Sequence, residues 1–383
     1  MRPDIRHAPL DPNDWPDLAR VLGSCFGIPA EKWDSFRSRL GDDNLRVAHV
    51  GGQVAGGLGI YRMGQVFGGR SVPLGGLAGV GIAAEHRGAG VAGAMVGDTL
   101  RALRDDGVPL AGLYASTQRL YRSIGFEQAG NRVAWKVGLR AIDVLDRTLP
   151  VTRVEGADAL RPLYHPTHGN LDRSAAIWER ITRPRGAESW CYRVGDEGYA
   201  VLGTEPSGVS DFHFHVLVRD WQAHTPAAAR RLWTLLADHS SLGTEARWFG
   251  AASDPRIAHL SEQAAEIIGL QRWMIRILDV AGALTARGWP AHVSGELHLD
   301  IDDPLFSENA GRWVVEVAEG RAHVARGGSG SLKLGIRGLA PLYTGFYDPG
   351  VLAELGWVQG DAATLRTAAR LFASPEPWMS EMY

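Results

Sequence analysis

The stretch that decides the fold is His86-Arg-Gly-Ala-Gly-Val-Ala-Gly93, a glycine-rich segment between two apolar ones. Its three glycines match the G-x-G-x-x-G pattern of dinucleotide-binding turns. Arg87, Gly90 and Ala92 also match a second pattern, R-x-x-G-x-A, which adds a cation. In both patterns the backbone N–H groups at a helix N-terminus face an anion, and the helix dipole favours its charge. The segment therefore predicts a pyrophosphate-binding turn, and its surroundings distinguish the two ligands.

A dinucleotide-binding fold makes demands that the neighbouring sequence does not meet. Its glycine turn stands near the start of a domain, and an acidic residue about 20 residues further on binds the ribose. Here a long stretch with helix and strand patterns precedes the turn. The next predicted strand, 108–115, ends at Ser116, and the acids Asp105 and Asp106 come before it. An NAD-dependent oxidoreductase is therefore a poor match.

The segments on both sides of the turn agree with the second pattern. Residues 75–84 are small and apolar, as in a central strand that is covered on both faces. Residues 91–104 carry apolar side chains at helical spacing, so a helix should begin where the turn ends. After the strand at 108–115, residues 118–126 predict a short helix that carries Tyr121 and ends in Gly-Phe.

These landmarks resemble the GNAT acetyltransferases, and among them the Eis-type (enhanced intracellular survival) enzymes of actinobacteria. The matching residues are Val80-Gly-Ile82, His86-Arg87, Gly90, Ala115-Ser116 and Leu120-Tyr121-x-x-x-Gly125-Phe126. The resemblance is strong over 75–130 and loose elsewhere. It implies an α/β (α+β) chain with two GNAT-like domains, the second degenerate, and a sterol-carrier-protein-like α+β domain. The expected bounds are 1–140 for the catalytic domain, 141–285 for the degenerate one and 286–383 for the third.

Composition agrees with a globular protein, since 45% of the residues are hydrophobic and 22% are charged. A length of 383 residues predicts two or three domains. A net charge of −3 gives no reason to expect nucleic acid or an anionic membrane as partner. Two cysteines, Cys25 and Cys191, cannot build a disulfide framework. With no apolar run long enough for a signal peptide or membrane span, a cytoplasmic protein is expected.

Periodicity predicts the remaining elements of the first domain. A strand near residue 5 precedes helices at 12–22 and from residue 28, and a hairpin turns across Gly51-Gly52. Residues 132–139 alternate in polarity and should close the first sheet.

The second domain should contain strands at 199–202, 212–218 and 273–278 and a helix at 226–239. The turn between its strand and helix, residues 219–226, contains no glycine. Because close approach of phosphate favours residues without Cβ, we expect no CoA in this half.

The third domain should begin with a strand at 293–300. Hairpins are expected around 318–320 and 326–330, followed by helices near 340–346 and 361–372.

Acyl transfer from CoA to an amine needs a held donor, a polarised thioester, a base and an acid. The resemblance implies that backbone amides at 87–92 hold the pyrophosphate, with the Arg87 guanidinium as a clamp. The Val80 N–H would face the thioester oxygen. Ser116 contacts the thiol region or caps the following helix. The cofactor-binding residues implied in this way are Val80, Ile82, Arg87, Gly88, Gly90, Val91, Ala92 and Ser116.

Tyr121 matches the general acid of the family; the alternative is a packed aromatic ring. The base that the resemblance implies is the chain's own C-terminal carboxylate, here that of Tyr383, with Glu376 and Glu381 as alternatives. The expected reaction is direct attack of a primary amine on acetyl-CoA, or another acyl-CoA, in a ternary complex.

Phe26, Trp33 and Gly79 are the expected substrate-pocket residues, although ordinary core packing would also explain the two aromatic rings. The resemblance also has departures. Where family members that acetylate aminoglycosides are expected to have an acid that attracts the polycation, this chain has Ile28 and Met382, and Gly79 stands where the family often has an aromatic residue. These departures predict a less acidic and more open pocket, for a less charged amine or a longer acyl donor.

Further expectations concern partners. The acceptor should be a small-molecule amine, and the resemblance implies a hexamer. His213 and His215 should share a strand face, but they lack a third ligand, so no metal site is expected. The alternative function is a non-catalytic acyl-CoA or lipid-binding protein with a vestigial GNAT core.

Overall fold

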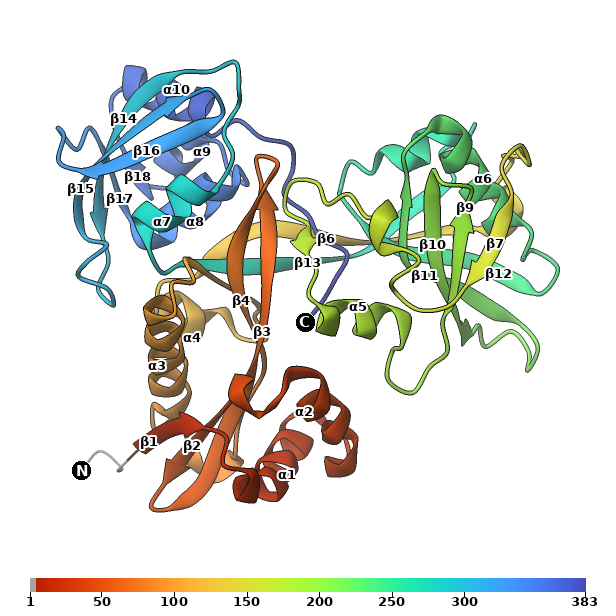
Figure 1. Ribbon diagram of the computed structural model, residues 1–383, viewed down its shortest axis with the longest axis horizontal. Helices are drawn as coiled ribbons and strands as arrows, with labels where there is room; N and C mark the ends of the chain where they lie inside the picture. The colour runs from red at the N-terminus through yellow and green to blue at the C-terminus, as the bar shows by residue number, and fades with distance from the viewer. Residues whose placement is uncertain (1–4) are drawn as a thin grey trace. The chain divides into compact units, whose positions relative to one another are not determined.

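The computed structural model describes residues 5–383, which form two compact units (Figure 1). The first contains the chain up to Gly130, then Arg272–Pro377, and Tyr383. The second contains Asn131–Gln271 and Trp378–Met382. Each unit is therefore built from segments that are distant in the sequence.

A mixed sheet organises the N-terminal part of the first unit. Its strands, in spatial order, are β1 (Ile5–Pro9), β2 (Leu45–Val50), β3 (Gln53–Phe67), β4 (Arg70–Ile82), β5 (Leu110–Tyr114) and the end of β13 (Ala265–Ile277). The helices are α1 (Trp15–Phe26), α2 (Asp34–Leu40), α3 (Val91–Asp105) and α4 (Gln118–Ser123). β4 and β5 pair in parallel, and the predicted hairpin across Gly51-Gly52 is confirmed as β2–β3.

Helices cover both faces of this sheet. Met95, Leu100 and Leu103 of α3 are buried against apolar side chains of β3, β4 and β5. On the other face, glycines of β3 let the helices come close: a Cβ at Gly57 would lie 2.5 Å from a Leu18 methyl carbon. The apolar spacing of each helix thus places it on the sheet by burial of one face.

β4 and β5 are paired over a short stretch and then separate. Their register pairs extend only from Leu74–Leu110 to Gly76–Gly112, although β4 continues to Ile82. Beyond Gly76, the two strands no longer bond to each other in the described pairing.

A second, smaller sheet completes the first unit. Its spatial order is β16 (Arg321–Arg326), β15 (Gly311–Ala318), β14 (Gly295–Asp302), β17 (Leu332–Gly335) and β18 (Val358–Gln359). Its helices are α7 (Val280–Ala286), α8 (Ile336–Thr344), α9 (Pro349–Glu354) and α10 (Ala362–Leu371). The β15–β16 hairpin is confirmed, with Glu319 and Gly320 at positive φ, as a two-residue hairpin turn requires. The hairpin predicted at 326–330 is wrong, because β16 pairs with β15 whereas β17 pairs in parallel with β14.

The second unit contains a run of neighbouring strands that pair in mixed directions. Its order is β6 (Glu127–Gly138), β12 (Gly243–Gly250), β11 (Phe214–Ala223), β10 (Gly198–Pro206), β9 (Trp190–Val194) and β7 (Val151–Val154). The remaining elements are β8 (Leu171–Asp172), α5 (Ala175–Thr182) and α6 (Pro226–Ala237). Short 3-10 helices occur at Pro12–Asp14, Ala30–Trp33, Asp42–Asn44, Ala84–His86, Leu139–Ala141, Arg161–Leu163 and Pro255–His259. A tryptophan cluster of Trp135, Trp221, Trp233 and Trp248 forms much of its core.

Two strand segments belong to the other unit than the one predicted. Residues 133–138 of β6 pair with β12 in the second unit, and the residues from Trp273 to Ile277 pair with β5 in the first. Alternation identified both segments as strands, but it carries no information on the partner strand. The predicted turn at 219–226 is also too long, because β11 continues to Ala223. Among the described residues, no helix is long and apolar enough to cross a bilayer.

Candidate active site

The glycine-rich turn of the first unit opens directly into α3. Gly88 and Gly90 have φ of 80° and 84°, in the left-handed region that favours glycine. A Cβ built on either residue would meet no heavy atom of a non-neighbouring residue within 4 Å. Gly90 is the N-cap, no side chain caps the helix, and the first intrahelical bond runs from Ala94 N–H to Gly90 C=O. The N–H groups of the first turn are thus available, and the open cradle fits a pyrophosphate.

Gly93, the third glycine of the dinucleotide pattern, is different. It lies inside α3 without a positive φ, and its Cβ would make ordinary contact with Leu120 at 3.7 Å. Conformation therefore requires glycine at 88 and 90 but not at 93, as R-x-x-G-x-A predicts for Gly90.

The guanidinium of Arg87 is held beside this turn. Its Nε donates to the Ile82 carbonyl oxygen at 3.0 Å, and its Nη2 lies 3.5 Å from Cys25 Sγ. The charge is thereby placed at the carboxyl end of β4, next to the open N–H groups.

A β-bulge interrupts β4 just before that end. Gly57 faces Gly81 and Gly59 faces Ala78, so Leu58 alone faces two residues, Gly79 and Val80. Gly79 has φ 60°, as expected for a glycine bulge that re-aims the following backbone. The bulge takes Val80 out of the regular hydrogen-bonded pairing with β3. In this position its backbone N–H can face a ligand beside the strand.

The space predicted at Gly79 does not exist. A Cβ at this position would lie 3.3 Å from Phe36 and 3.4 Å from Trp33, so aromatic rings already fill it. The expectation of a more open pocket at this point is wrong.

Tyr121 lies on α4, buried except for 7% of its surface, with its ring 5.8 Å from Phe126 in an edge-on contact. Burial raises the pKa of its hydroxyl to about 12. Gly125 ends this segment with φ 94°, and any Cβ there would collide with Arg276 at 2.6 Å. Ser116 is exposed at the end of β5. Because Thr117 is the N-cap of α4, the capping role considered for Ser116 is wrong.

The ring of Tyr383 lies over the point where β4 and β5 separate. A Cβ at Gly76 would be 2.6 Å from Tyr383 Cε2, and one at Gly112 would be 2.6 Å from its hydroxyl. These two glycines form the last register pair of the two strands. The absence of two side chains therefore creates the seat of the terminal residue. Of the alternative bases, Glu381 forms a buried ion pair with Arg173 in the second unit.

Aromatic rings connect the predicted pocket residues with the chain end. Neighbouring ring centroids lie 5.3–6.3 Å apart in the series Phe26, Trp33, Phe36, Tyr61, Tyr383 and Tyr114. Phe26 is 41% exposed, whereas Trp33 is buried. The Trp33 indole N–H and the Tyr61 hydroxyl are buried without a hydrogen-bond partner among the described residues. Sequence patterns missed Phe36, Tyr61 and Tyr114, because their spacing is that of ordinary core residues.

The equivalent turn of the second unit is closed. Only His224 and Thr225 separate β11 from α6, and Pro226 at the helix start has no N–H. Thr225 accepts hydrogen bonds from Ala228 N–H through its hydroxyl and from Ala229 N–H through its carbonyl. At this helix start, Pro226 therefore offers no donor, and the N–H groups of Ala228 and Ala229 are occupied.

The two predicted histidines do not share a strand face. His213 precedes β11 and bonds with Ser210, whereas His215 bonds with Thr244 and Arg247 on the strand. No group of three or more His, Cys, Asp or Glu residues in 5–383 is arranged to hold a metal ion. Met382 lies in the second unit and is 41% exposed.

Comparisons with known proteins agree with this geometry. Residues 5–129 and 169–277 each match an acetyltransferase (GNAT) domain family, and 280–380 match a sterol carrier protein domain family. An uncharacterized N-acetyltransferase of Streptomyces griseus is 29% identical, over 83% of this chain and 84% of its own length. N-acetyltransferase Eis of Mycobacterium tuberculosis is 25% identical, over 95% and 96%.

Solved structures share the entire fold. A GCN5-related N-acetyltransferase from Anabaena variabilis superposes with a TM-score of 0.95 at 34% identity, covering 99% of this chain and all of the other. Eis1 from Mycobacterium abscessus, at 21% identity, has the same fold with a TM-score of 0.82 over 99% of this chain and 100% of its own. The chain therefore belongs to the GCN5-related N-acetyltransferases, as an Eis-like enzyme with two GNAT domains and a C-terminal sterol carrier protein domain.

Proposed function

We propose that this N-acetyltransferase transfers an acyl group, acetyl in the first instance, from acyl-CoA to a primary amine by direct attack in a ternary complex. The observation that carries the proposal is the open cradle at Gly88–Gly90, next to a bulged β4 and in the same unit as Tyr121 and Tyr383. An NAD-binding turn would need a ribose acid that the following strand lacks. A vestigial core would not need to retain two open glycines in strained conformations.

Donor binding would use the backbone first. The N–H groups from Gly88 to Ala92 would hold the pyrophosphate, with Arg87 as the nearby cation. Val80 and Ile82 would pair with the pantetheine amides, as an added strand does. Ser116, exposed at the end of β5, would lie toward the thiol.

The reaction would then use both chain-end and side-chain groups. The Tyr383 carboxylate accepts a proton from the substrate ammonium, since an α-carboxyl group with a pKa of about 3.5 is ionised at neutral pH. The amine forms a C–N bond to the thioester carbon, and the Val80 N–H stabilises the oxyanion. The C–S bond breaks, and the Tyr121 hydroxyl gives its proton to the sulfur. A proton released by the amine restores Tyr121.

Burial of Tyr121 has two consequences. The hydroxyl stays protonated throughout the neutral range, because burial raises its pKa to about 12. Transfer of its proton to a thiolate whose pKa is about 8.5 in water is uphill by roughly 5 kcal/mol. Burial of the thiolate raises its pKa too and narrows that difference, so the two groups must react inside the same dry site.

The aromatic series supports an acceptor with an apolar or aromatic body. It contains the buried rings of Trp33, Phe36 and Tyr61. The Trp33 indole N–H and the Tyr61 hydroxyl have no hydrogen-bond partner among the described residues, so a rearrangement of these rings around an acceptor would offer two donors to a neutral polar group. Ile28 stands where an acid would attract a polycation. We therefore propose a monoamine rather than an aminoglycoside.

An amine panel tests the proposal. Thiol release from acetyl-CoA is measured with aromatic, aliphatic and polycationic amines, and binding of acetyl-CoA is measured in parallel. Release with aromatic monoamines is expected. Binding without release by any amine would support the non-catalytic alternative, and the highest kcat/KM with an aminoglycoside would overturn the acceptor class. The hexamer, the cytoplasmic location and the three domain bounds remain predictions; solution mass tests the first.

A further inference from the structure

The second unit contains a cavity of its own. Its volume is about 460 Å³, and every residue that lines it belongs to Asn131–Gln271 or Trp378–Met382. The cavity lies beside the parallel strands β11 and β12, where their described pairing ends at Val218–Trp248. A volume of this size is typical of sites for small molecules.

Apolar side chains form most of the cavity lining. Ile177 and Ile181 lie one turn apart on the same face of α5, and both are buried. Leu217 of β11 and Phe249 of β12 contribute from the two strands. These walls fit the apolar body of a ligand.

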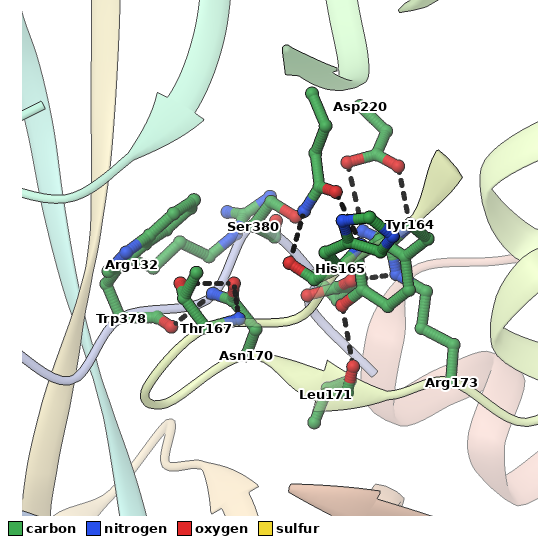
Figure 2. A network of polar contacts seen from close by, with 12 residues as sticks. Arg132, Tyr164, His165, Thr167, Asn170, Leu171, Arg173, Asp220, Trp378 and Ser380 are labelled. Carbon is green, nitrogen blue, oxygen red and sulfur yellow. Dashed lines mark hydrogen bonds and ion pairs between the residues drawn. The ribbon is translucent and has the colours of Figure 1, made fainter. Parts of the chain in front are cut away.

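The segment Trp378–Met382 lines another part of the cavity and is fixed within the second unit by polar contacts (Figure 2). Asn170 Nδ2 donates to the Trp378 carbonyl oxygen at 2.8 Å, and Arg132 Nε donates to the Ser380 carbonyl oxygen at 2.8 Å. Arg132 Nη1 also donates to Gln271 Oε1 at 2.8 Å. The Arg132 guanidinium is therefore engaged in holding this wall.

The charged residues of the lining carry an excess of cations. They are Arg132, Arg180, Arg219, Arg247, Glu205 and Glu381. Both glutamates already have a cation: Arg247 Nη1 donates to Glu205 at 2.6 Å, and Arg173 Nε donates to Glu381. The carboxylates of the cavity are thus matched within the protein.

Two of the lining arginines differ from the others. The guanidinium groups of Arg180 and Arg219 form no hydrogen bond or ion pair with the residues that the structure describes. Arg180 lies on α5 next to Ile181 and is exposed, whereas Arg219 is half-buried. Arg219 is therefore the cation whose charge is least compensated by solvent or protein.

The fold provides a defined place for Arg219. Val201 pairs with Asp220 and Leu202 with Val218, so Arg219 is the extra residue of a β-bulge, a feature that re-aims a side chain. A Cβ at Gly203 would lie 2.8 Å from Arg219 Nε and 2.9 Å from its Nη2, so the guanidinium lies against bare backbone. The absence of a side chain at Gly203 thus makes room for the cation.

The environment of Arg219 favours an anionic ligand. Burial lowers the pKa of its guanidinium, and the attraction of Glu205 opposes only part of this effect. A cation removed from water is costly unless it is paired. A carboxylate would supply the missing partner, because its two oxygens match the fork of a guanidinium group.

We propose that the cavity binds a monocarboxylate with an apolar body. The carboxylate pairs with Arg219, with Arg180 as the second nearby cation, and the body lies against the apolar wall of α5. The site needs neither the glycine turn nor Tyr383, so it is independent of the acyl transfer proposed above. It gives the degenerate GNAT unit a ligand that its capped helix start does not have to hold.

Binding of 2-naphthoate to the full chain tests the site. Isothermal titration measures its Kd, with 2-naphthylmethanol as the neutral counterpart and acetate as the head group alone. We expect 2-naphthoate to bind at least about tenfold more tightly than either, because the site combines an apolar wall with a charged partner. Excess CoA should leave the Kd within about twofold, since the cavity contains no residue of the first unit.

Arg219→Met removes the cation and retains a long side chain. The Kd of 2-naphthoate should rise at least about tenfold, as expected for the loss of a charge-assisted hydrogen bond, while the Kd of 2-naphthylmethanol changes less than about twofold. Arg193→Met is the matched control, because Arg193 is also a half-buried strand residue of this unit but pairs with Asp196 and does not line the cavity. It should leave both Kd values within about twofold.

Thermal unfolding gives a second readout. Without ligand, Arg219→Met should unfold at the same temperature as the full chain or higher, because an uncompensated buried charge is removed. Added 2-naphthoate should raise the unfolding temperature of the full chain but not that of Arg219→Met. Arg180→Met, at an exposed position, should fold normally and raise the Kd of 2-naphthoate about threefold.

Three results would overturn the site. One is equal affinity for 2-naphthoate and 2-naphthylmethanol, since the cation would then have no role. Another is a Kd of 2-naphthoate that neither Arg219→Met nor Arg180→Met changes. The third is displacement of 2-naphthoate by CoA, which would assign its binding to the turn of the first unit.

Discussion

The two GNAT-like units differ at the turn that leads from a strand into a helix. In each, a strand leads into a helix beside a parallel neighbour: β4 into α3 next to β5, and β11 into α6 next to β12. The first helix begins after Gly88 and Gly90, with its N–H groups open. The second begins at Pro226, which has no N–H, after Thr225, whose hydroxyl accepts from the Ala228 N–H. One fold thus yields an open or a capped helix start, depending on a few residues at the turn.

The first unit also seats the ring of the last residue, Tyr383. Gly76 and Gly112 leave room for the Tyr383 ring, where β4 and β5 separate. The two units thus differ in an open turn and in the seat of the proposed base. Changes to these two features test whether they explain where acyl transfer occurs.

The largest effect is expected from blocking the terminal carboxylate. Extension of the chain by a short glycine-serine segment moves the carboxylate away from the site and should lower kcat about 100- to 10,000-fold, the range of general base catalysis. Turnover of acetyl-CoA with the best amine measures it. An N-terminal extension of equal length is the control, and full activity of the C-terminally extended chain would refute the base assignment.

Replacing the general acid should be nearly as damaging. Tyr121→Phe keeps the edge-on contact with Phe126 but removes the proton donor, so kcat should fall about 100-fold with little change in KM. A donor with a better leaving group, such as an acetyl ester of an acidic thiophenol, should recover part of the rate. Equal losses with both donors would indicate that Tyr121 is a packing residue only.

Gly90 and Gly93 form a matched pair within the turn. Gly90→Ala places a Cβ on a residue with φ 84°, which costs roughly 1–2 kcal/mol, so KM for acetyl-CoA should rise about tenfold. Gly93→Ala places a Cβ in ordinary contact with Leu120 and should change KM less than about twofold. Similar effects at both positions would favour the dinucleotide pattern over R-x-x-G-x-A.

Thr225 tests the closed turn of the second unit. Removal of its capping hydroxyl in Thr225→Ala should lower the free energy of unfolding by about 1 kcal/mol while KM for acetyl-CoA stays the same. Isothermal titration should show a single acetyl-CoA site per chain. A second site, in the full chain or the variant, would contradict the difference between the units.

The pH profile should show the smallest change. Because burial raises the pKa of Tyr121 to about 12, the acid remains protonated below that value, and kcat should not decline between about pH 7 and 10 through its loss. A falling limb near pH 9 that disappears in Tyr121→Phe would show that the hydroxyl titrates far below this range.

Local features of the active site were predictable from sequence. The turn at 86–93, the helix after it and the short helix of Tyr121 all follow from spacing and from glycine, whose conformational freedom acts within a few residues. One prediction failed at the same level. Gly79 was interpreted as free space, and it is a bulge residue packed against Trp33 and Phe36.

The sequence did not predict which strands pair when they are distant along the chain. Alternating polarity identified β6 and the end of β13 as strands, yet each segment was predicted in the other unit than the one to which it belongs. Likewise, the 326–330 segment carries turn residues, but it leads to a parallel strand rather than to a hairpin.

By itself, the sequence determined the family and the glycine turn before α3, because a glycine at positive φ and a helix start leave their mark on adjacent residues. It also predicts the donor site at this turn and Tyr121 as the acid. Only the tertiary structure decided the seat of Tyr383 over Gly76 and Gly112, the aromatic series and the Arg173–Glu381 pair, whose members stand 208 residues apart. Contacts between distant residues depend on complementary shape and charge brought together by the whole fold, and no local pattern records them.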